Sequence, residues 1–338
     1  MLRTLLRVGV LLLAFAARAG SVEAVHGTVR REAIYSRVLG VPKNLLVYLP
    51  PSYDHSPYAT KRYPVAVYLH GRWGDETDWM NLGHLARSVD SLVTLGLHEM
   101  IIVMPDGDEG WWTTWALPSD TASCRITPHR SEPAAEFCVV HPRYDDYLAR
   151  ELLPYIDATY RTIPSRESRG IAGLSMGGYG ALSIAATYPE LFSVAVSHGG
   201  ALTPGIMADS SGLSRTGTVV WRQGRTTKEL RASAGENEWN AMYPMFGLDS
   251  STWAPRDPAN MLRALKAAHR PMPWLYMDVP LDEGRLLQNR AFRDAMRASD
   301  IPLTYSEWPG RHDWKYWSAR SLPGLHFLSD HLAQDASH

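Results

Sequence analysis

The sequence predicts an α/β domain, with a mostly parallel central sheet covered by helices on both faces. Three observations lead to this. Short apolar runs recur along the chain, segments with apolar residues at three- and four-residue spacing lie between them, and 45% of the 338 residues are hydrophobic. Strand, helix and strand in series is typical of a parallel sheet that is buried on both faces.

The expected strands are the short apolar runs, and the expected helices are the periodic segments between them. The strands are predicted at residues 44–50, 64–70, 100–106, 169–175, 193–199, 273–279 and 302–308. The helices are predicted at residues 82–95, 145–159, 178–187, 258–268 and 289–299, followed by a final helical segment. No internal repeat or Pro/Gly linker interrupts this order, so we expect residues 20–338 to form a single domain.

The first residues have the features of a secretory signal peptide. Arg3 and Arg7 supply positive charge, residues 8–16 form an apolar run, and Ala17-Arg18-Ala19 is an A-x-A cleavage site. The run is far shorter than the roughly 20 residues that span a bilayer, so no stable membrane insertion is expected. The sequence therefore predicts a signal peptide over residues 1–19 and a secreted or periplasmic mature chain.

The overall charge limits the classes of partner. A net charge of -1 and an isoelectric point near 6.9 provide no long-range field that would attract nucleic acid or an anionic membrane. We therefore expect a small-molecule partner and no nucleic acid.

The two cysteines, Cys124 and Cys138, predict a disulfide if the chain is exported to an oxidising compartment. Neither has the spacing to a histidine that metal ligands show, so no metal site is predicted.

Two stretches interrupt the alternation of strands and helices. Residues 111–144 are rich in Ser, Pro and Trp, and residues 204–257 are polar with weak periodicity. Loops of this length in a compact α/β domain are usually lids or binding loops. We expect both to be insertions, and whether residues 204–257 close over a pocket is left open.

The segment Gly173-Leu174-Ser175-Met176-Gly177 is a G-x-S-x-G motif between an expected strand and an expected helix. This context is typical of a nucleophile elbow. Glycine costs a helix about 1 kcal/mol relative to alanine, so the glycines need a steric reason. Side chains two positions before and after the serine would collide, which predicts that Gly173 and Gly177 serve as bare backbone. Ser175 is the expected nucleophile, at the N-terminus of the helix, where N–H groups favour an oxyanion.

A serine nucleophile needs a base and an acid, which in α/β-hydrolases follow it in the order acid, then histidine. His312 comes directly after the last expected strand and is the predicted base; His198, at another strand end, is the less favoured alternative. The loop after the preceding strand offers Asp282 and Glu283, and either carboxylate would hold the imidazole tautomer. Asp278 lies within that strand and is the weaker candidate.

The oxyanion hole is predicted from two backbone N–H groups. One belongs to Met176, beside the nucleophile, and the other to Arg72, in the loop that follows the strand at residues 64–70. Loss of one such donor typically lowers the rate by roughly 10²- to 10³-fold.

With these residues in place, the chain resembles the esterase D-like branch of the α/β-hydrolases, which includes S-formylglutathione hydrolases, feruloyl and acetyl-xylan esterases and mycobacterial mycolyltransferases. The segments that carry the resemblance occur in the family's order at residues 47–54, 63–79, 101–107, 152–162, 170–192 and 301–317. The resemblance implies an α/β-hydrolase fold and ester chemistry. It also favours Glu283 over Asp282 as the acid, because Glu283 stands at the family's acid position counted back from Asn289-Arg290, although Pro280 replaces the family's usual glycine.

Tryptophans at the expected carboxyl ends of strands are candidate substrate contacts. Trp73, Trp111 and Trp112 are placed to stack on a sugar or a phenolic acyl group, with packing in the loops as the alternative. The Arg72 side chain is a candidate for favouring an anionic or polyhydroxylated substrate.

The sequence therefore predicts a secreted serine carboxylic-ester hydrolase that acts through a Ser-His-acid triad and an acyl-enzyme, with no metal or cofactor. The expected substrate is a small-molecule or carbohydrate-linked ester. One alternative is acyl transfer to an alcohol or sugar with the same residues. Another, of a different class, is a non-catalytic binding protein on a hydrolase frame.

Overall fold

The computed structural model of the chain describes residues 26–121, 124, 133–202, 206–209, 220–223, 226–234, 242–282 and 284–334. The predicted signal peptide at residues 1–19 and the predicted acid Glu283 lie outside the described residues. Both therefore remain predictions.

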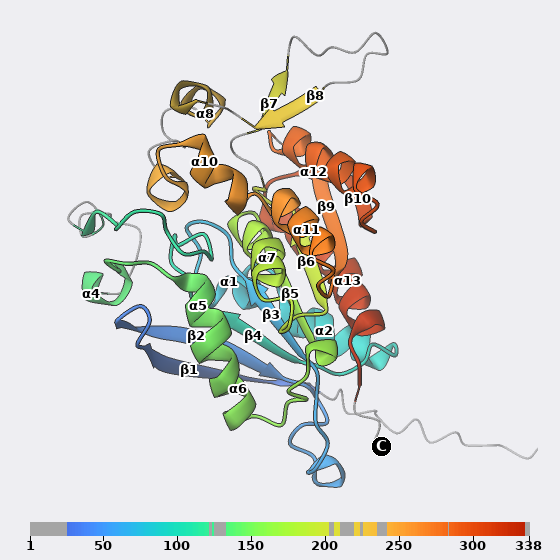
Figure 1. The fold of residues 1–338 in the computed structure, drawn as a ribbon. Coiled ribbons are helices and arrows are strands. Elements are labelled where there is room, and N and C mark those ends of the chain that lie inside the picture. Colours follow the sequence, from blue (N-terminus) through green and yellow to red (C-terminus); the bar gives the residue numbers. More distant parts are fainter. Residues whose placement is uncertain are drawn as a thin grey trace, which may run out of the picture.

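One eight-stranded sheet forms the centre of the molecule, in the strand order β1-β2-β4-β3-β5-β6-β9-β10 (Figure 1). The strands are β1 (Thr28–Ser36), β2 (Val41–Leu49), β3 (Val65–Leu69), β4 (Ile101–Pro105), β5 (Arg169–Leu174), β6 (Val194–His198), β9 (Trp274–Asp282) and β10 (Thr304–Arg311). All neighbours from β4 to β10 are parallel, whereas β1 and β2 are antiparallel to their partners. The predicted α/β class is thus confirmed.

Helices cover both faces of the sheet, and each face has its own apolar core (Figure 1). One face is covered by α5 (Tyr144–Tyr147), α6 (Leu153–Thr159), α7 (Met176–Thr187), α11 (Pro258–Ala267) and α12 (Leu286–Ala298). The other is covered by α1 (Asp78–Asn81), α2 (Leu85–Thr94) and α13 (Trp314–His331). The central strands β3 and β5 are buried along their whole length, which explains why they read as continuous apolar runs.

The structure differs from two of the predicted helices. The helix expected at residues 82–95 begins later, as α2 at Leu85, because His84 has a positive φ of 52° that no helix continues through. The helix expected at residues 145–159 contains a π-helical turn at Leu148–Leu152, just before Pro154, which has no N–H to donate.

The two expected insertions contribute further elements. Residues 111–144 include α4 (Ala134–Phe137) and the predicted disulfide, in which the Cα atoms of Cys124 and Cys138 lie 5.7 Å apart. Residues 204–257 include the antiparallel pair β7 (Ile206–Asp209) and β8 (Val220–Gln223), with α8 (Thr227–Ala234) and α10 (Ser250–Trp253). In Figure 1 the elements of the second insertion lie together at one end of the molecule.

The two insertions are joined by backbone hydrogen bonds. The N–H of Ala116 donates to the carbonyl oxygen of Met245 over 2.9 Å, and the N–H of Leu117 donates to that of Pro244 over 2.9 Å. Segments that are far apart in the sequence therefore lie side by side at this point.

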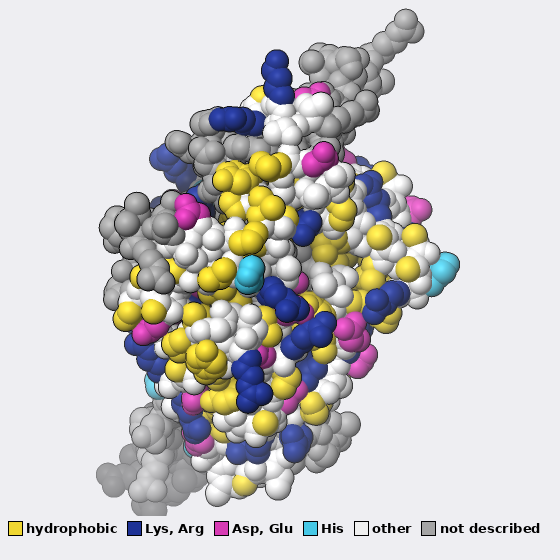
Figure 2. Space-filling model, turned by 60° about the vertical axis from the view of Figure 1, so that its left-hand side comes forward, with side chains coloured by type: hydrophobic (Ala, Val, Ile, Leu, Met, Phe, Trp, Pro, Cys, Tyr) yellow, Lys and Arg dark blue, Asp and Glu magenta, His cyan; other side chains and the backbone are white. Residues whose placement is uncertain are grey.

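No single type of side chain covers the face drawn in Figure 2, where basic, acidic and apolar side chains all occur. In the part of the chain that the structure describes, no helix combines the length and the apolar character needed to cross a bilayer.

Candidate active site

Ser175 lies at the sharp turn between β5 and α7, with φ 52° and ψ -115°. A positive φ is strained for a residue with a side chain, and such strain is typical of functional turns. A Cβ atom on Gly173 would lie 2.3 Å from the carbonyl oxygen of Gly177, and one on Gly177 would lie 2.4 Å from the carbonyl oxygen of Leu69. Both contacts are with backbone, so no side chain can move aside. These approaches are the steric reason for the glycines of the motif.

The backbone of Ser175 is held by the end of β6 and by the segment after it. Its N–H donates to the carbonyl oxygen of His198 over 3.0 Å, and its carbonyl oxygen accepts from the N–H of Ala201 over 3.0 Å. The residue is almost completely covered, with 7% of its surface exposed. The strained turn is thus fixed by hydrogen bonds on both sides of the nucleophile candidate.

His312 meets Ser175 although the two residues are 137 positions apart in the chain. The distance from His312 Nε2 to Ser175 Oγ is 2.9 Å. His312 follows β10 directly, and the next residue, Asp313, caps α13 by accepting from the N–H of Tyr316. The ring of Trp317 packs edge-on against the imidazole, with 4.7 Å between the ring centroids. The structure therefore brings together the predicted nucleophile and the predicted base.

Of the two acid candidates, the structure describes only Asp282, at the end of β9 and next to the strand that leads to His312. Asp282 is the last residue of β9, is exposed, and is paired in register with Arg311, the residue before His312. Glu283 lies outside the described residues. The weaker candidate Asp278 is buried within β9, where its carboxylate contacts His198. The choice between Glu283 and Asp282 remains a prediction.

The loop after β3 passes close to the nucleophile. A Cβ atom on Gly71 would lie 3.5 Å from the Cβ of Ser175. His70 Nε2 accepts from the N–H of Gly107 over 2.9 Å, so its proton is on Nδ1, which donates to the carbonyl oxygen of Gly71 over 2.8 Å. Because the peptide bond is trans, the N–H of Arg72 points away from that carbonyl and from the imidazole. His70 thereby fixes the orientation of the peptide group that carries the predicted oxyanion donor.

Met176, the other predicted oxyanion donor, is the first residue of α7 and is fully buried. The first N–H groups of a helix have no acceptor within the helix. The Met176 N–H is therefore available at the end of the helix where the dipole favours negative charge.

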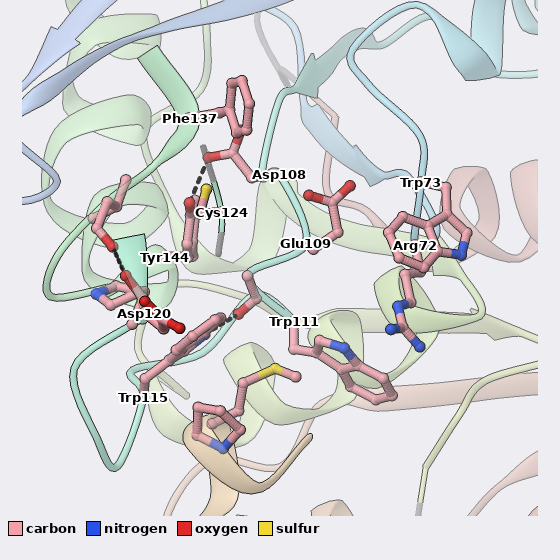
Figure 3. Close-up of a pocket in the computed structure, with 16 residues that line it drawn as sticks. Arg72, Trp73, Asp108, Glu109, Trp111, Trp115, Asp120, Cys124, Phe137 and Tyr144 are labelled. Carbon is pink, nitrogen blue, oxygen red and sulfur yellow. Dashed lines mark hydrogen bonds between the residues drawn. The ribbon is translucent and has the colours of Figure 1, made fainter. Parts of the chain in front are cut away.

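A cavity of about 330 Å³ lies beside the Arg72 loop (Figure 3). Its walls are mainly aromatic and apolar, and they come from both insertions and from the loop after β3. They include Trp73, Trp111, Trp115, Phe137, Val139 and Met245, with Arg72, Asp108 and Glu109 among the polar groups. The guanidinium carbon of Arg72 lies 4.4 Å from the centroid of the Trp73 ring. Cys124 also lines the cavity, so the disulfide is part of its wall.

The structure separates the three tryptophans predicted to contact substrate. Trp73, which is 57% exposed, and Trp111 both line the cavity. Trp112 does not: it is fully buried, its indole N–H donates to the carbonyl oxygen of His70 over 3.3 Å, and a Cβ atom on Gly180 would lie 2.5 Å from its own Cβ. The prediction for Trp112 is corrected, because this side chain packs beneath the elbow.

The sequence analysis missed a buried polar cluster behind the cavity. Lys43 Nζ lies 3.1 Å from Asp106 Oδ2 and 2.6 Å from Asp108 Oδ2, and the hydroxyl of Tyr144 also donates to Asp108. Asp106 and Asp108 follow the end of β4. Their position at the carboxyl end of a strand is the sequence signal that could have identified them as part of the site. The described residues include no group of three or more His, Cys, Asp or Glu side chains placed to hold a metal ion.

Comparisons with known proteins identify the family of the chain. The family model described as "Putative esterase" matches residues 36–328. An esterase of Mycobacterium tuberculosis strain H37Rv is 29% identical over 281 residues, which are 79% of this chain and 51% of the relative, so the chain spans about half that protein's length. An acetyl esterase of Caldicellulosiruptor saccharolyticus is 23% identical over 300 residues, covering 87% of this chain and 96% of the relative.

Solved structures share the fold. A ferulic acid esterase is 25% identical with a TM-score of 0.65, and the match covers 90% of this chain and 98% of that one. An S-formylglutathione hydrolase of Staphylococcus aureus is 21% identical with a TM-score of 0.62, covering 90% and 99% of the two chains. The predicted α/β-hydrolase fold is confirmed by these similarities and by the strand order of the sheet.

Proposed function

The chain belongs to the esterase family, a family of carboxylic ester hydrolases, as the resemblance in its sequence predicts, and from this premise we propose that it hydrolyses a carboxylic ester with Ser175 as nucleophile. The observation that carries the proposal is the 2.9 Å distance between Ser175 Oγ and His312 Nε2 at a strained strand-to-helix turn. A hydroxyl is a poor nucleophile near neutral pH, and a hydrogen-bonded imidazole is the base that activates it.

In the proposed reaction, Ser175 Oγ attacks the ester carbonyl while His312 Nε2 takes the hydroxyl proton. The tetrahedral oxygen is held by the N–H groups of Arg72 and Met176, and His312 then gives the proton to the departing alcohol. Glu283 or Asp282 holds the Nδ1–H tautomer of His312 and stabilises the imidazolium. Water, activated by the same imidazole, resolves the acyl-enzyme and restores the serine.

The hydrogen bond from His70 Nδ1 to the Gly71 carbonyl supports the role of Arg72. A donor that is already oriented costs no reorganisation when the oxyanion forms. Its orientation does not depend on the Arg72 side chain, whose guanidinium packs on the ring of Trp73.

We propose that the cavity beside Arg72 takes the bulkier part of the ester. Its volume of about 330 Å³ and its aromatic walls suit a ring system, with Trp73 and Trp111 as the stacking surfaces. Arg72 adds a donor for an anionic or hydroxylated group. Proteins similar to this chain include an acetyl esterase and a ferulic acid esterase, which are named for one small and one aromatic acyl group.

We also propose that the protein is exported, with residues 1–19 removed, and that residues 20–338 fold as a single domain. The disulfide between Cys124 and Cys138 is consistent with an oxidising compartment. N-terminal sequencing of the protein recovered from outside the cytoplasm tests this proposal; an intact Met1 would contradict it.

The test of the activity is Ser175→Ala, assayed with p-nitrophenyl acetate and a bulkier aryl ester. Removal of the nucleophile should lower turnover by at least about 10⁴-fold. Ser183→Ala is the matched control, because Ser183 is a second buried serine, within α7, and its hydroxyl bonds only the Gly180 carbonyl in the described structure. Full turnover by Ser175→Ala would show that the site is wrong. Product analysis with and without an added alcohol separates hydrolysis from acyl transfer.

A further inference from the structure

Three buried side chains form a hydrogen-bonded set beneath the elbow: His198 at the end of β6, Asp278 in β9 and Tyr316 in α13. The distance from His198 Nδ1 to Asp278 Oδ2 is 2.7 Å, and that from the Tyr316 hydroxyl to Asp278 Oδ1 is 2.8 Å. His198 and Asp278 are completely buried, and Tyr316 nearly so. A carboxylate can only accept hydrogen bonds, so the imidazole and the phenol both donate.

One end of this set is joined to the nucleophile. The carbonyl oxygen of His198 accepts the N–H of Ser175 over 3.0 Å, and the N–H of Gly199 donates to the carbonyl oxygen of Asp278 over 2.7 Å. The backbone of Ser175 is therefore tied to the same two strands that carry the buried carboxylate and imidazole.

The other end is joined to the base. The N–H of Tyr316 donates to Asp313 Oδ1 over 3.0 Å, and Asp313 directly follows His312. Hydrogen bonds, connected through the backbone and side chains of His198, Asp278 and Tyr316, thus link the Ser175 backbone to the residue next to His312. Burial, together with the Asp278 carboxylate, raises the pKa of the Tyr316 phenol above its ordinary range, so the phenol remains a donor.

The surrounding packing is shaped around these rings. A Cβ atom on Gly324 of α13 would lie 2.8 Å from Nε2 and Cε1 of His198, and one on Gly310 would lie 2.7 Å from the ring of Tyr316. Within the described residues His198 Nε2 has no hydrogen-bond partner. A buried nitrogen without a partner costs about 1–3 kcal/mol, a cost that an apolar ring of similar size would avoid. Packing alone therefore does not explain a histidine at this position.

We propose that His198, Asp278 and Tyr316 are positioning residues that set the distance between Ser175 Oγ and His312 Nε2. They do not touch the substrate; they hold β6, β9 and the start of α13 in the arrangement that aligns nucleophile and base. A misplacement of about 1 Å in reacting groups lowers a rate by roughly 10²-fold. The inference rests on the proposed function, because it concerns the alignment of that nucleophile and that base.

The test is Tyr316→Phe, which removes one hydroxyl and keeps the ring. We expect kcat for p-nitrophenyl acetate to fall by about 10- to 100-fold while KM changes by less than about twofold, because alignment changes and binding does not. Tyr305→Phe is the matched control: the Tyr305 hydroxyl donates to Glu307 over the same 2.8 Å, in a half-buried place on β10 outside the series. Its kcat should stay within about twofold of the parent enzyme.

A second variant tests whether the bonds act in series. Asp278→Asn alone should also lower kcat, and the double variant Asp278→Asn/Tyr316→Phe should be no slower than the more affected single variant, because the two changes interrupt one path. Thermal unfolding of each variant identifies any loss that comes from unfolded protein.

A kcat for folded Tyr316→Phe within about twofold of the parent, or a loss equalled by Tyr305→Phe, would overturn the positioning role. That result is distinct from failure of the proposed function, which would appear as full turnover by Ser175→Ala.

Discussion

The elbow and the cavity are linked by the loop after β3, which passes the nucleophile at Gly71 and lines the cavity at Arg72, and they are built in opposite ways. At the elbow, backbone meets backbone: all but one of the residues in α7 are buried, and Gly173 and Gly177 have no room for a methyl group. The cavity is an open space of about 330 Å³ between side chains, many of them from the two insertions. The comparison indicates that the proposed chemistry is fixed by main-chain packing, whereas the proposed substrate preference depends on side chains that can change without disturbing it.

Gly173→Ala tests the elbow half of this comparison and should have the largest effect. The new Cβ would lie 2.3 Å from a backbone oxygen that cannot move independently. We expect a loss of at least about 3 kcal/mol in the free energy of unfolding in urea and a fall in turnover of more than about 100-fold. Gly284→Ala is the control for stability, since nothing lies within 4 Å of its Cβ position, and a change below about 1 kcal/mol is expected. Equal unfolding free energies for the two variants would contradict the steric account.

Val139→Trp tests the cavity half by filling part of the space. Turnover of a bulky aryl ester, measured as kcat/KM, should fall by more than about 10-fold while that of an acetyl ester stays within about twofold. The neighbouring Val140 is 53% exposed and does not line the cavity, so Val140→Trp is the matched control and should leave both esters unchanged. Equal losses for the two esters with Val139→Trp would mean that the cavity does not hold the bulkier group.

Removal of the disulfide should lower the stability moderately and should affect the binding of bulky esters in the cavity without affecting the elbow. The bridge joins residues 14 positions apart, and closing a loop of that length contributes about 3 kcal/mol in the chain-entropy model. We expect the double variant Cys124→Ser/Cys138→Ser to unfold at lower urea concentration and to show a raised KM for bulky esters, with turnover of the acetyl ester retained. Loss of acetyl ester turnover in the folded variant would show that the elbow depends on the insertion.

The smallest effect is expected from Glu307→Gln, at the edge strand β10 that leads to His312. Hydrogen bonds from Arg290 hold the pKa of Glu307 at about 2, below its ordinary value of 4.5. A carboxylate with a lowered pKa stabilises the folded state above pH 4.5, and this contribution is lost as the pH falls from 4.5 towards 2.

The difference in unfolding free energy between the parent protein and Glu307→Gln should therefore be about 1–2 kcal/mol at pH 7, since Arg290 is partly exposed, and should vanish near pH 2. Glu190→Gln removes an exposed pair with Arg270 and should show no measurable difference at either pH. A difference for Glu307→Gln that persists near pH 2 would rule out its charge as the cause.

Most of the sheet and the centre of the site were predictable because their signals are local. All of the strands predicted from apolar runs are present, and the serine motif and His312 each follow such a run. The edge strand β1 was missed, since most of its residues are exposed and it has no continuous apolar run. Helix α1 was missed because four residues are too few to show a period.

The parts that sequence could not supply depend on contacts between distant segments. Trp111 and Trp112 are adjacent, are chemically identical and share a positive φ of 54°. Only Trp111 lines the cavity. The pairing of His198 with Asp278 follows from the register of β6 against β9, which no local pattern specifies. Asp278 was considered only as a triad acid, and its contact with His198 was not foreseen.

The backbone bonds of Ala116 and Leu117 with the 244–245 segment have a consequence for engineering and for divergence within the family. A loop transplanted from a relative into only one of the two positions would face a partner segment that does not match it at these hydrogen bonds. Loop exchanges intended to alter substrate preference should succeed when both segments come from the same donor protein. The two segments are therefore expected to change together in evolution, although more than a hundred residues separate them in the chain.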